Sequence, residues 1–276
     1  MNPIYIQALS LSDRFGNSED CIYAAADLAR QLHVEGIDIE DRLLSSYEPN
    51  YLKELAYSIT SRGVNFGYCG LRVDFQKPIS SIACEINRAK TLIHSLQYLG
   101  IRSIRIPGNG VVNNHSFEET FEAVIDKFCV ICQCAAQSGV TVYLHNHNHG
   151  ATPSTGDQVI KMLKRINSPV LSYVLDTGQF QGSPGASGKG NSTKIADNQL
   201  YESIEICASK AEIVRAKFYF ANDIEEQWLD YQRIVQILKS TNFDGPISIV
   251  YEPRGNLLST EALPIAVTYL RDLLKH

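Results

Sequence analysis

Residues 139–150 read Gly-Val-Thr-Val-Tyr-Leu-His-Asn-His-Asn-His-Gly, an apolar run that passes directly into alternating histidines. Side chains of a strand point alternately to opposite faces, so Tyr143, His145 and His147 share one face. The other face is apolar up to Leu144 and is suited to packing against helices. We predict a parallel strand that presents imidazoles at its carboxyl end, the end where α/β folds place their ligand sites.

A second strand of the same kind follows about thirty residues later. Residues 169–178 read Pro-Val-Leu-Ser-Tyr-Val-Leu-Asp-Thr-Gly, an apolar run that ends in the carboxylate of Asp176. Consecutive parallel strands are usually neighbours and end at the same edge of the sheet. We therefore expect Asp176 to lie close to His145 and His147, so that the two segments form one cluster of ionisable groups.

The whole chain alternates strand and helix patterns. Helical periodicity is seen, for example, at 82–99, 117–138, 158–166, 199–208 and 231–240. Strand patterns occupy 4–9, 33–39, 64–69, 101–106, 140–145, 170–176, 212–220 and 246–252. Eight strand–helix units without a break in composition predict a single (β/α)8 TIM barrel of the α/β class over residues 1–276. The alternative, an open doubly wound sheet, usually carries a glycine fingerprint after its first strand, and this sequence has none there.

Composition and charge narrow the class of protein. The chain has 276 residues and a formal net charge of −5, so its charge gives no reason to expect nucleic acid binding. It has no apolar run long enough to cross a bilayer, and it opens into strand-like residues without the pattern of a secretory signal. Its seven cysteines are an odd number, unlike a paired disulfide framework. We expect a cytoplasmic protein with no nucleic acid or membrane partner.

Two other features allow more than one interpretation. Residues 179–193 are rich in Gly and Ser and follow the sixth predicted strand, so they are either a flap at the catalytic end or a plain surface loop. Their glycine spacing does not match a phosphate loop. Cys129, Cys132 and Cys134 lie in the amphipathic run at 117–138, where thiols pack as small apolar groups. A metal site at these thiols is the less favoured alternative.

Several of these segments resemble the sugar phosphate isomerase/epimerase family, the xylose isomerase-like TIM barrels. The similarity covers almost the whole chain, and its clearest parts are 36–40, 146–147, 175–178, 216–219, 230–231 and 247–249. The resemblance implies the TIM barrel fold and an isomerase, epimerase or related lyase. One barrel hosts many reactions, so the resemblance does not name the substrate.

The same resemblance implies a divalent metal held by a Glu, an Asp, a His and a Glu from the fifth to the eighth strand. Here His145 stands at the fifth-strand position, Asp176 matches the sixth, and Arg215 and Val250 replace the last two ligands. Because an arginine keeps its proton and repels a divalent cation, we predict that the site holds no metal and no cofactor. The alternative is a rebuilt zinc or manganese site made from His145, His147, Asp176 and Glu252.

Strand parity places a set of ionisable groups inside the barrel mouth. We predict that the catalytic residues are His145, His147, Asp176, Lys217 and Glu252, and that the substrate-binding residues are Glu40, Arg105, Arg215 and Tyr219. A histidine next to Asp176 is the expected general base, a lysine or arginine can stabilise a developing enolate, and Glu252 can return the proton.

The sequence thus predicts an enzyme that transfers protons on a small oxygenated substrate, either sugar-like or a keto or carboxylate compound, without a metal. Its cationic groups favour an anionic or enolisable substrate. Two alternatives stay open: a metal-dependent sugar isomerase or epimerase with the rebuilt site, and a barrel that binds a metabolite without catalysis. Arg215 could also be one half of a buried ion pair that only fills the former metal site. Whether a homo-oligomer forms is left open.

Overall fold

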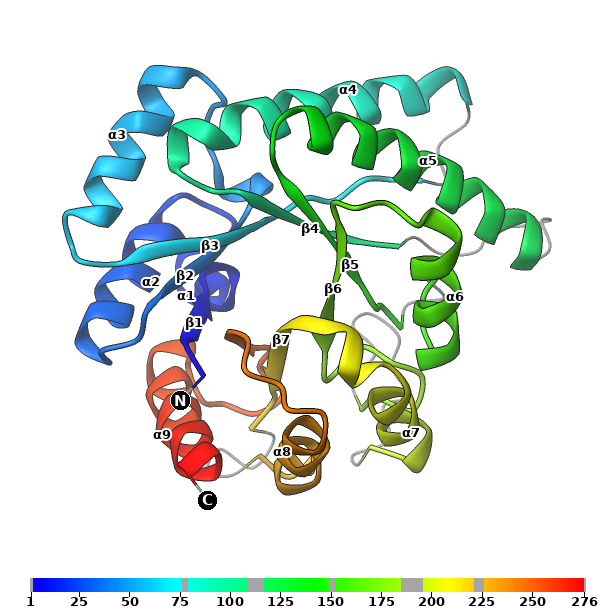
Figure 1. The fold of residues 1–276 in the computed structure, drawn as a ribbon. Helices are drawn as coiled ribbons and strands as arrows, with labels where there is room; N and C mark the ends of the chain where they lie inside the picture. Colours follow the sequence, from blue (N-terminus) through cyan, green and yellow to red (C-terminus); the bar gives the residue numbers. More distant parts are fainter. Residues whose placement is uncertain are drawn as a thin grey trace.

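The structure is a computed structural model, and it describes residues 2–75, 79–108, 117–148, 152–184, 196–220 and 226–275. Eight strands form a closed barrel in which each strand pairs with the next one in the sequence, and the last strand pairs with the first. All of these pairings are parallel. Figure 1 shows the strands at the centre of the molecule with the helices around them. The predicted α/β TIM barrel is confirmed.

The strands coincide closely with the predicted segments. They are β1 (Ile4–Gln7), β2 (Gly36–Glu40), β3 (Asn65–Gly70), β4 (Ser103–Pro107), β5 (Thr141–His145), β6 (Leu171–Asp176), β7 (Ala211–Phe218) and β8 (Ile247–Tyr251). The second predicted strand starts too early, because His33 has a φ of 51° and this left-handed conformation interrupts the extended chain before β2. Strand β8 ends at Tyr251, so Glu252 lies just beyond it.

The helices lie outside the barrel, and all five of the predicted ones are present. The α-helices are α1 (Ser12–Phe15), α2 (Asp20–Gln31), α3 (Pro49–Thr60), α4 (Ile79–Ser95), α5 (Phe117–Gln137), α6 (Gly156–Ile166), α7 (Asn198–Cys207), α8 (Tyr231–Ser240) and α9 (Ser259–Lys275). Short 3-10 helices occupy Ala8–Leu11, Asp41–Leu43, Leu96–Leu99 and Ala208–Lys210. The predicted helix at 231–240 coincides with α8, whose N-cap Asp230 accepts a hydrogen bond from the Arg233 N–H.

The barrel separates two layers of packing. On the outer face of the strands, side chains such as Ile6, Ile37 and Leu144 are fully buried against the helices. Inside the barrel, Tyr68, Tyr143, Val174 and Ile213 form a smaller apolar cluster of their own. Along β5, β6 and β7, the next inward positions toward the carboxyl ends carry ionisable side chains. The apolar cluster therefore closes the barrel beneath a polar layer.

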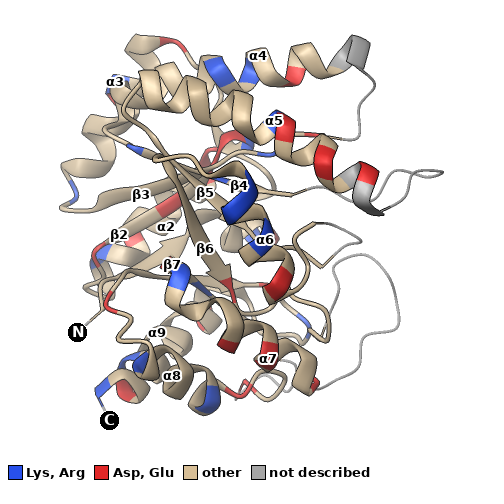
Figure 2. Ribbon diagram, turned by 45° about the vertical axis from the view of Figure 1, so that its right-hand side comes forward, with Lys and Arg blue, Asp and Glu red and all other residues tan. Residues whose placement is uncertain are grey.

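The outer helices carry charged residues. Acidic and basic residues are both present on the outer helices α4 and α5, whereas the charged residues of α8 are all basic (Figure 2). In the part of the chain that the structure describes, no helix is long and apolar enough to cross a membrane. The predicted flap at 179–193 is described only up to residue 184, and the rest of it lies outside the described residues.

Candidate active site

A cavity of about 1240 Å³ opens at the carboxyl ends of the strands. This is the end at which TIM barrels hold their active sites. The cavity is lined by eight of the nine predicted site residues, namely Glu40, Arg105, His145, His147, Asp176, Arg215, Lys217 and Glu252. The structure therefore brings almost the whole predicted set to one place, although these residues come from six different strand ends.

Arg105 on β4 joins β2 to β5 at the bottom of the cavity. Its Nη2 donates to both carboxylate oxygens of Glu40, at 2.6 and 2.8 Å. Its Nη1 lies 2.8 Å from Nδ1 of His145. The ion pair between Arg105 and Glu40 lies over Gly70 of β3. A Cβ added at Gly70 would lie 2.3 Å from a Glu40 oxygen and 2.6 Å from Nη2 of Arg105. A glycine is therefore required at residue 70 for this ion pair to cross the barrel.

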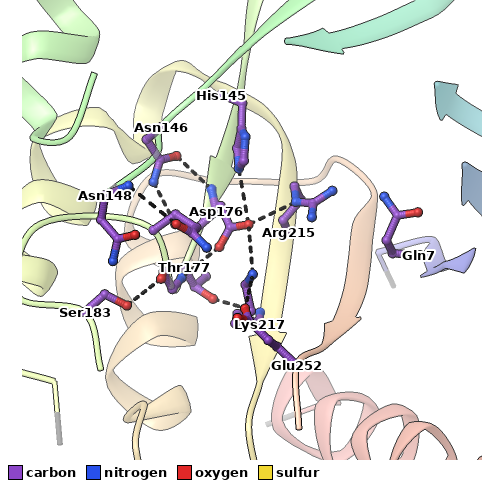
Figure 3. A network of polar contacts seen from close by, with 12 residues as sticks. Gln7, His145, Asn146, Asn148, Asp176, Thr177, Ser183, Arg215, Lys217 and Glu252 are labelled. Carbon is purple, nitrogen blue, oxygen red and sulfur yellow. Dashed lines mark hydrogen bonds and ion pairs between the residues drawn. The ribbon is translucent and has the colours of Figure 1, made fainter. Parts of the chain in front are cut away.

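Asp176 at the end of β6 accepts hydrogen bonds from the two neighbouring strands (Figure 3). Its Oδ2 lies 3.2 Å from Nε2 of His145 and 3.0 Å from Nε of Arg215, and its Oδ1 accepts from the Gly178 N–H at 2.9 Å. Nζ of Lys217 is 3.9 Å from the same Oδ2. The carboxylate of Asp176 is thus an anchor for three side chains.

The contacts continue across the barrel and close into a ring. Nη1 of Arg215 donates to the Tyr68 hydroxyl, and Nε2 of Gln7 lies 3.4 Å from that hydroxyl and 3.1 Å from Oε1 of Glu40. We call this set the floor ring, and its members are Gln7, Glu40, Tyr68, Arg105, His145, Asp176 and Arg215. It takes one side chain from each of the strands β1 to β7. Its two carboxylates balance its two guanidinium groups, so its formal charge is zero.

The floor ring fixes the protonation of His145. Arg105 can only donate, so Nδ1 of His145 is the acceptor, and Nε2 carries the proton that it donates to Asp176. Burial and the charge of Arg105 hold the pKa of His145 well below its usual value of 6.5. The imidazole is therefore neutral and both of its nitrogens are occupied. This geometry does not favour the general-base role that the sequence suggested for His145.

Asp176 stays ionised although its side chain is fully buried. Burial raises the pKa of this carboxyl, but the charges of Lys217 and Arg215 and the imidazole hydrogen bond outweigh burial and hold the pKa well below 3.8. A carboxylate with such partners is a weak base. The geometry therefore makes Asp176 the residue that orients its neighbours.

Four side chains lie above the floor ring and form the cavity wall: His147, Gln179, Lys217 and Glu252. Nζ of Lys217 is 3.0 Å from Oε2 of Glu252, and Arg254 donates to the other oxygen of Glu252 at 3.1 Å. The ring of His147 stands edge-on to that of His145, with centroids 5.7 Å apart. These wall side chains present ionisable and amide groups to the cavity directly above the floor ring.

Tyr219 is the one predicted site residue that does not line the cavity. It follows β7, its hydroxyl donates to the Gly178 carbonyl at 3.3 Å, and its ring packs against that of Trp228 at 5.2 Å. An added Cβ at Gly178 would lie 2.8 Å from the Tyr219 hydroxyl. The structure therefore places Tyr219 behind the Asp176 loop, where it supports the turn after β6.

Four polar residues that shape the site are absent from the predicted set: Gln7, Tyr68, Asn146 and the cavity-wall residue Gln179. Gln7 and Tyr68 are members of the floor ring, and they could have been found because both occupy inward positions of predicted strands. Asn146 lies on the opposite, helix-facing side, where its amide accepts from the Asp176 N–H and donates to the Asp176 carbonyl, both at 2.9 Å. The Tyr173 hydroxyl donates to the same Asn146 oxygen at 2.8 Å. Asn146 thus ties the ends of β5 and β6 together.

The donor set does not fit a divalent metal ion. Among the described residues, no three His, Cys, Asp or Glu side chains come together in a way that could hold one. Asp176 is already bonded to Arg215, and Glu252 is already bonded to Lys217 and Arg254. A cation would have to displace the guanidinium of Arg215, which cannot lose its charge. Three of the four side chains of the rebuilt zinc or manganese site, His145, Asp176 and Glu252, are therefore engaged with cations of the protein itself.

Comparison with protein families agrees with this barrel and its strand ends. The family model described as xylose isomerase-like TIM barrel matches residues 26–273. The chain belongs to this family. No curated protein matches the sequence. The resemblance inferred from the strand-end motifs is thus confirmed at the level of the family.

Solved structures of similar fold include sugar epimerases. A D-psicose 3-epimerase from Clostridium cellulolyticum H10, solved with D-tagatose, shares 12% identity with a TM-score of 0.75, covering 99% of each chain. A D-allulose 3-epimerase from Methylomonas sp. shares 16% identity with a TM-score of 0.72, covering 99% of this chain and 98% of that one. The IOLI protein, solved with a zinc atom, shares 16% identity with a TM-score of 0.73 at the same coverage. At these identities the similarity establishes the fold.

Proposed function

We propose that this protein is an isomerase or epimerase that moves a proton on the carbon next to a carbonyl group of a small sugar-like substrate. The family and the named neighbours support this reaction class. The observation that carries the proposal is the Lys217–Glu252 pair on the cavity wall, with Nζ and Oε2 3.0 Å apart. A carboxylate and an ammonium group at one point can accept a proton and bind the neighbouring oxygen.

Glu252 is the group to which we assign proton removal. Burial raises its pKa, but the charges of Lys217 and Arg254 outweigh burial and lower it below 4.5, so the carboxylate is ionised at neutral pH. The Glu252 side chain is 25% exposed, whereas that of Asp176 is 0% exposed. Glu252 is therefore both charged and within reach of a molecule in the cavity.

His147 is the group to which we assign proton return. It lines the same cavity from the end of β5, whereas Glu252 follows β8. These strands are three apart in a closed barrel of eight, so their end residues approach the cavity from different sides. Two proton-transfer groups on different sides of one carbon are what an epimerase needs.

The charge of the site supports an uncharged substrate. Each cation that the sequence analysis singled out has its own carboxylate: Arg105 pairs with Glu40, Arg215 with Asp176 and Lys217 with Glu252. A phosphate or carboxylate would find little excess positive charge at these groups. We therefore propose an enolisable sugar in place of the anionic compounds that the sequence also favoured, and a reaction that needs no metal.

The proposal is tested by incorporation of solvent deuterium into sugars, because any proton transfer of this kind exchanges the C–H hydrogen next to the carbonyl. A panel of ketoses and aldoses is incubated with the protein in heavy water and followed by NMR and mass spectrometry. We expect incorporation into at least one sugar, and a loss of about 10² to 10⁴-fold in Glu252→Gln. Glu54→Gln, an exposed change on α3, is the control and keeps the rate.

Two results would overturn the proposal. One is the absence of exchange with every sugar while a sugar still binds, which would indicate a binding protein. The other is a Glu252→Gln variant that exchanges as fast as the parent protein, which would place the base elsewhere.

A further inference from the structure

The positively charged guanidinium group of Arg215 is held in a fixed position at the bottom of the cavity. Its Nε donates to Asp176 at 3.0 Å and its Nη1 donates to the Tyr68 hydroxyl. Its guanidinium carbon also lies 5.9 Å from the centroid of the Tyr68 ring, within reach of a cation–π interaction. These three contacts determine the plane of the guanidinium group, and they leave one nitrogen uncommitted.

That nitrogen, Nη2 of Arg215, makes no hydrogen bond within the described ranges of the chain, and Arg215 lines the cavity. The charge that it carries is permanent. Burial lowers the pKa of Arg215, but Tyr68, Asp176 and Glu40 more than offset burial and raise it above its usual value. A donor of this kind suits an oxygen that gains negative charge during a reaction.

Gln179 supplies a second donor, from the end of the adjacent strand β6. It follows β6 directly, and its side chain is almost fully buried while still lining the cavity. Its Oε1 accepts from the Asn148 N–H at 3.4 Å, so the amide is oriented with Nε2 as the free donor. Nε2 has no acceptor in the part of the chain that the structure covers. β6 and β7 are adjacent, and Asp176 pairs in register with Arg215, so both donors belong to one sector of the barrel.

We propose that Nη2 of Arg215 and Nε2 of Gln179 form an oxyanion pocket, which binds the carbonyl oxygen of the substrate as that oxygen becomes an enolate. This inference rests on the proposed proton transfer. When the carboxylate of Glu252 takes the proton, the electron pair of the C–H bond forms a C=C bond and the C=O electrons move to the oxygen. Return of a proton to the carbon reverses these changes. The positive charge that stabilises the enolate oxygen then comes from the side chain of Arg215.

The test uses glycolohydroxamate, a small hydroxamate that imitates an enolate, and measures its dissociation constant by titration calorimetry. We expect binding to the parent protein, a weakening of about tenfold or more in Arg215→Lys, and a weakening of several-fold in Gln179→Ala. Arg215→Lys keeps a charge beside Asp176 but loses the nitrogen that faces the cavity. Exchange of solvent deuterium is measured in the same variants, and kcat is expected to fall more than KM rises.

The outcomes distinguish failure of the oxyanion pocket from failure of the proposed function. If both variants bind the hydroxamate and exchange deuterium as the parent does, the oxyanion pocket is wrong while the proposed function stands. If no sugar exchanges deuterium but hydroxamate binding depends on Arg215 and Gln179, the pocket stands and the proposed function fails. Should Arg215→Lys fail to fold by circular dichroism, Gln179→Ala decides alone, since among the described residues the Gln179 side chain makes a single hydrogen bond, of 3.4 Å. Glu54→Gln is the matched control and is expected to bind as the parent does.

Discussion

The floor ring and the cavity wall carry similar chemical groups but differ in how those groups are satisfied. In the floor ring each charge has an opposite partner and His145 has a fixed proton, with Glu40, Arg105 and Asp176 all buried. On the cavity wall, Lys217 and Glu252 are paired but the carboxylate is 25% exposed. Buried pairs of this kind set geometry, whereas groups that reach the cavity can exchange protons. The same residue types thus take different roles at two depths of one barrel.

The largest effect is expected on the cavity wall. Replacing Lys217 with Met removes the ammonium group that pairs with Glu252 and lies 3.9 Å from Asp176. We expect deuterium exchange to fall about 10² to 10³-fold, because Glu252 loses the ammonium group that orients it and the cavity loses a positive charge. The exchange rate is measured together with the midpoint of thermal unfolding, and the exposed change Lys210→Met is the control. An exchange rate equal to that of the control would remove Lys217 from the mechanism.

A smaller effect, on stability, is expected in the floor ring. Asp176→Asn leaves Arg215 and Lys217 without their shared anion, so we expect a loss of about 3–5 kcal/mol in the free energy of unfolding near neutral pH. The pKa of Asp176 is lowered in the folded state, so its stabilisation is present above the unfolded pKa and is lost as the pH falls. Urea titrations at several pH values measure this loss. Asp244→Asn, an exposed change, should cost little, and an equal cost in both variants would contradict the account.

Asp38 is predicted to show the opposite dependence on pH. It lies one inward position below Glu40, accepts from the Tyr68 N–H at 2.8 Å, and burial raises its pKa to about 6. A raised carboxyl pKa favours the folded state while the group is protonated, so this stability is full below pH 3.8 and is lost as the pH rises through about 6. Asp38→Asn should therefore be the more stable protein at pH 8, by up to about 3 kcal/mol. Urea unfolding at pH 4 and pH 8 checks this, and a variant less stable than the parent at pH 8 would refute it.

The last prediction is that the protonation state of His145 does not change with pH near neutrality. Its nitrogens are occupied by Arg105 and Asp176 and its pKa is held well below 6.5, so we expect the neutral form with the proton on Nε2 at pH 6.5 and above. The measurement is nitrogen-15 NMR of the labelled imidazole, assigned by comparison with His145→Gln. A titration of His145 near pH 6.5 would show that the floor ring is open in solution.

The fold could be predicted from the sequence because its signal is local and repeated. Each strand is a short apolar run, and the inward parity of His145, Asp176 and Arg215 follows from the two-residue period of a strand. Parity failed at Tyr219, because β7 ends at Phe218 and the Tyr219 side chain packs against Trp228 and the Gly178 carbonyl. Glu252 also lies beyond its strand, yet its Lys217 partner keeps it at the cavity.

The floor ring could not be predicted, because its links join residues far apart in the sequence. The contact between Tyr68 and Arg215 spans 147 residues and crosses the barrel from β3 to β7. The proton position on His145 depends on which nitrogen faces Arg105, and no sequence pattern encodes that orientation. Local periodicity placed the side chains on the inner face, while long-range packing determined which of them pair.

The most direct test of the account is deuterium exchange by protein that has been treated with a chelator and whose metal content has been determined. We expect exchange into a sugar at a rate that stays within about twofold after chelation and after addition of manganese or zinc, with far less than one metal ion per chain. Exchange that disappears on chelation and returns with either metal would contradict it, because the floor ring could not then take the place of a metal ion.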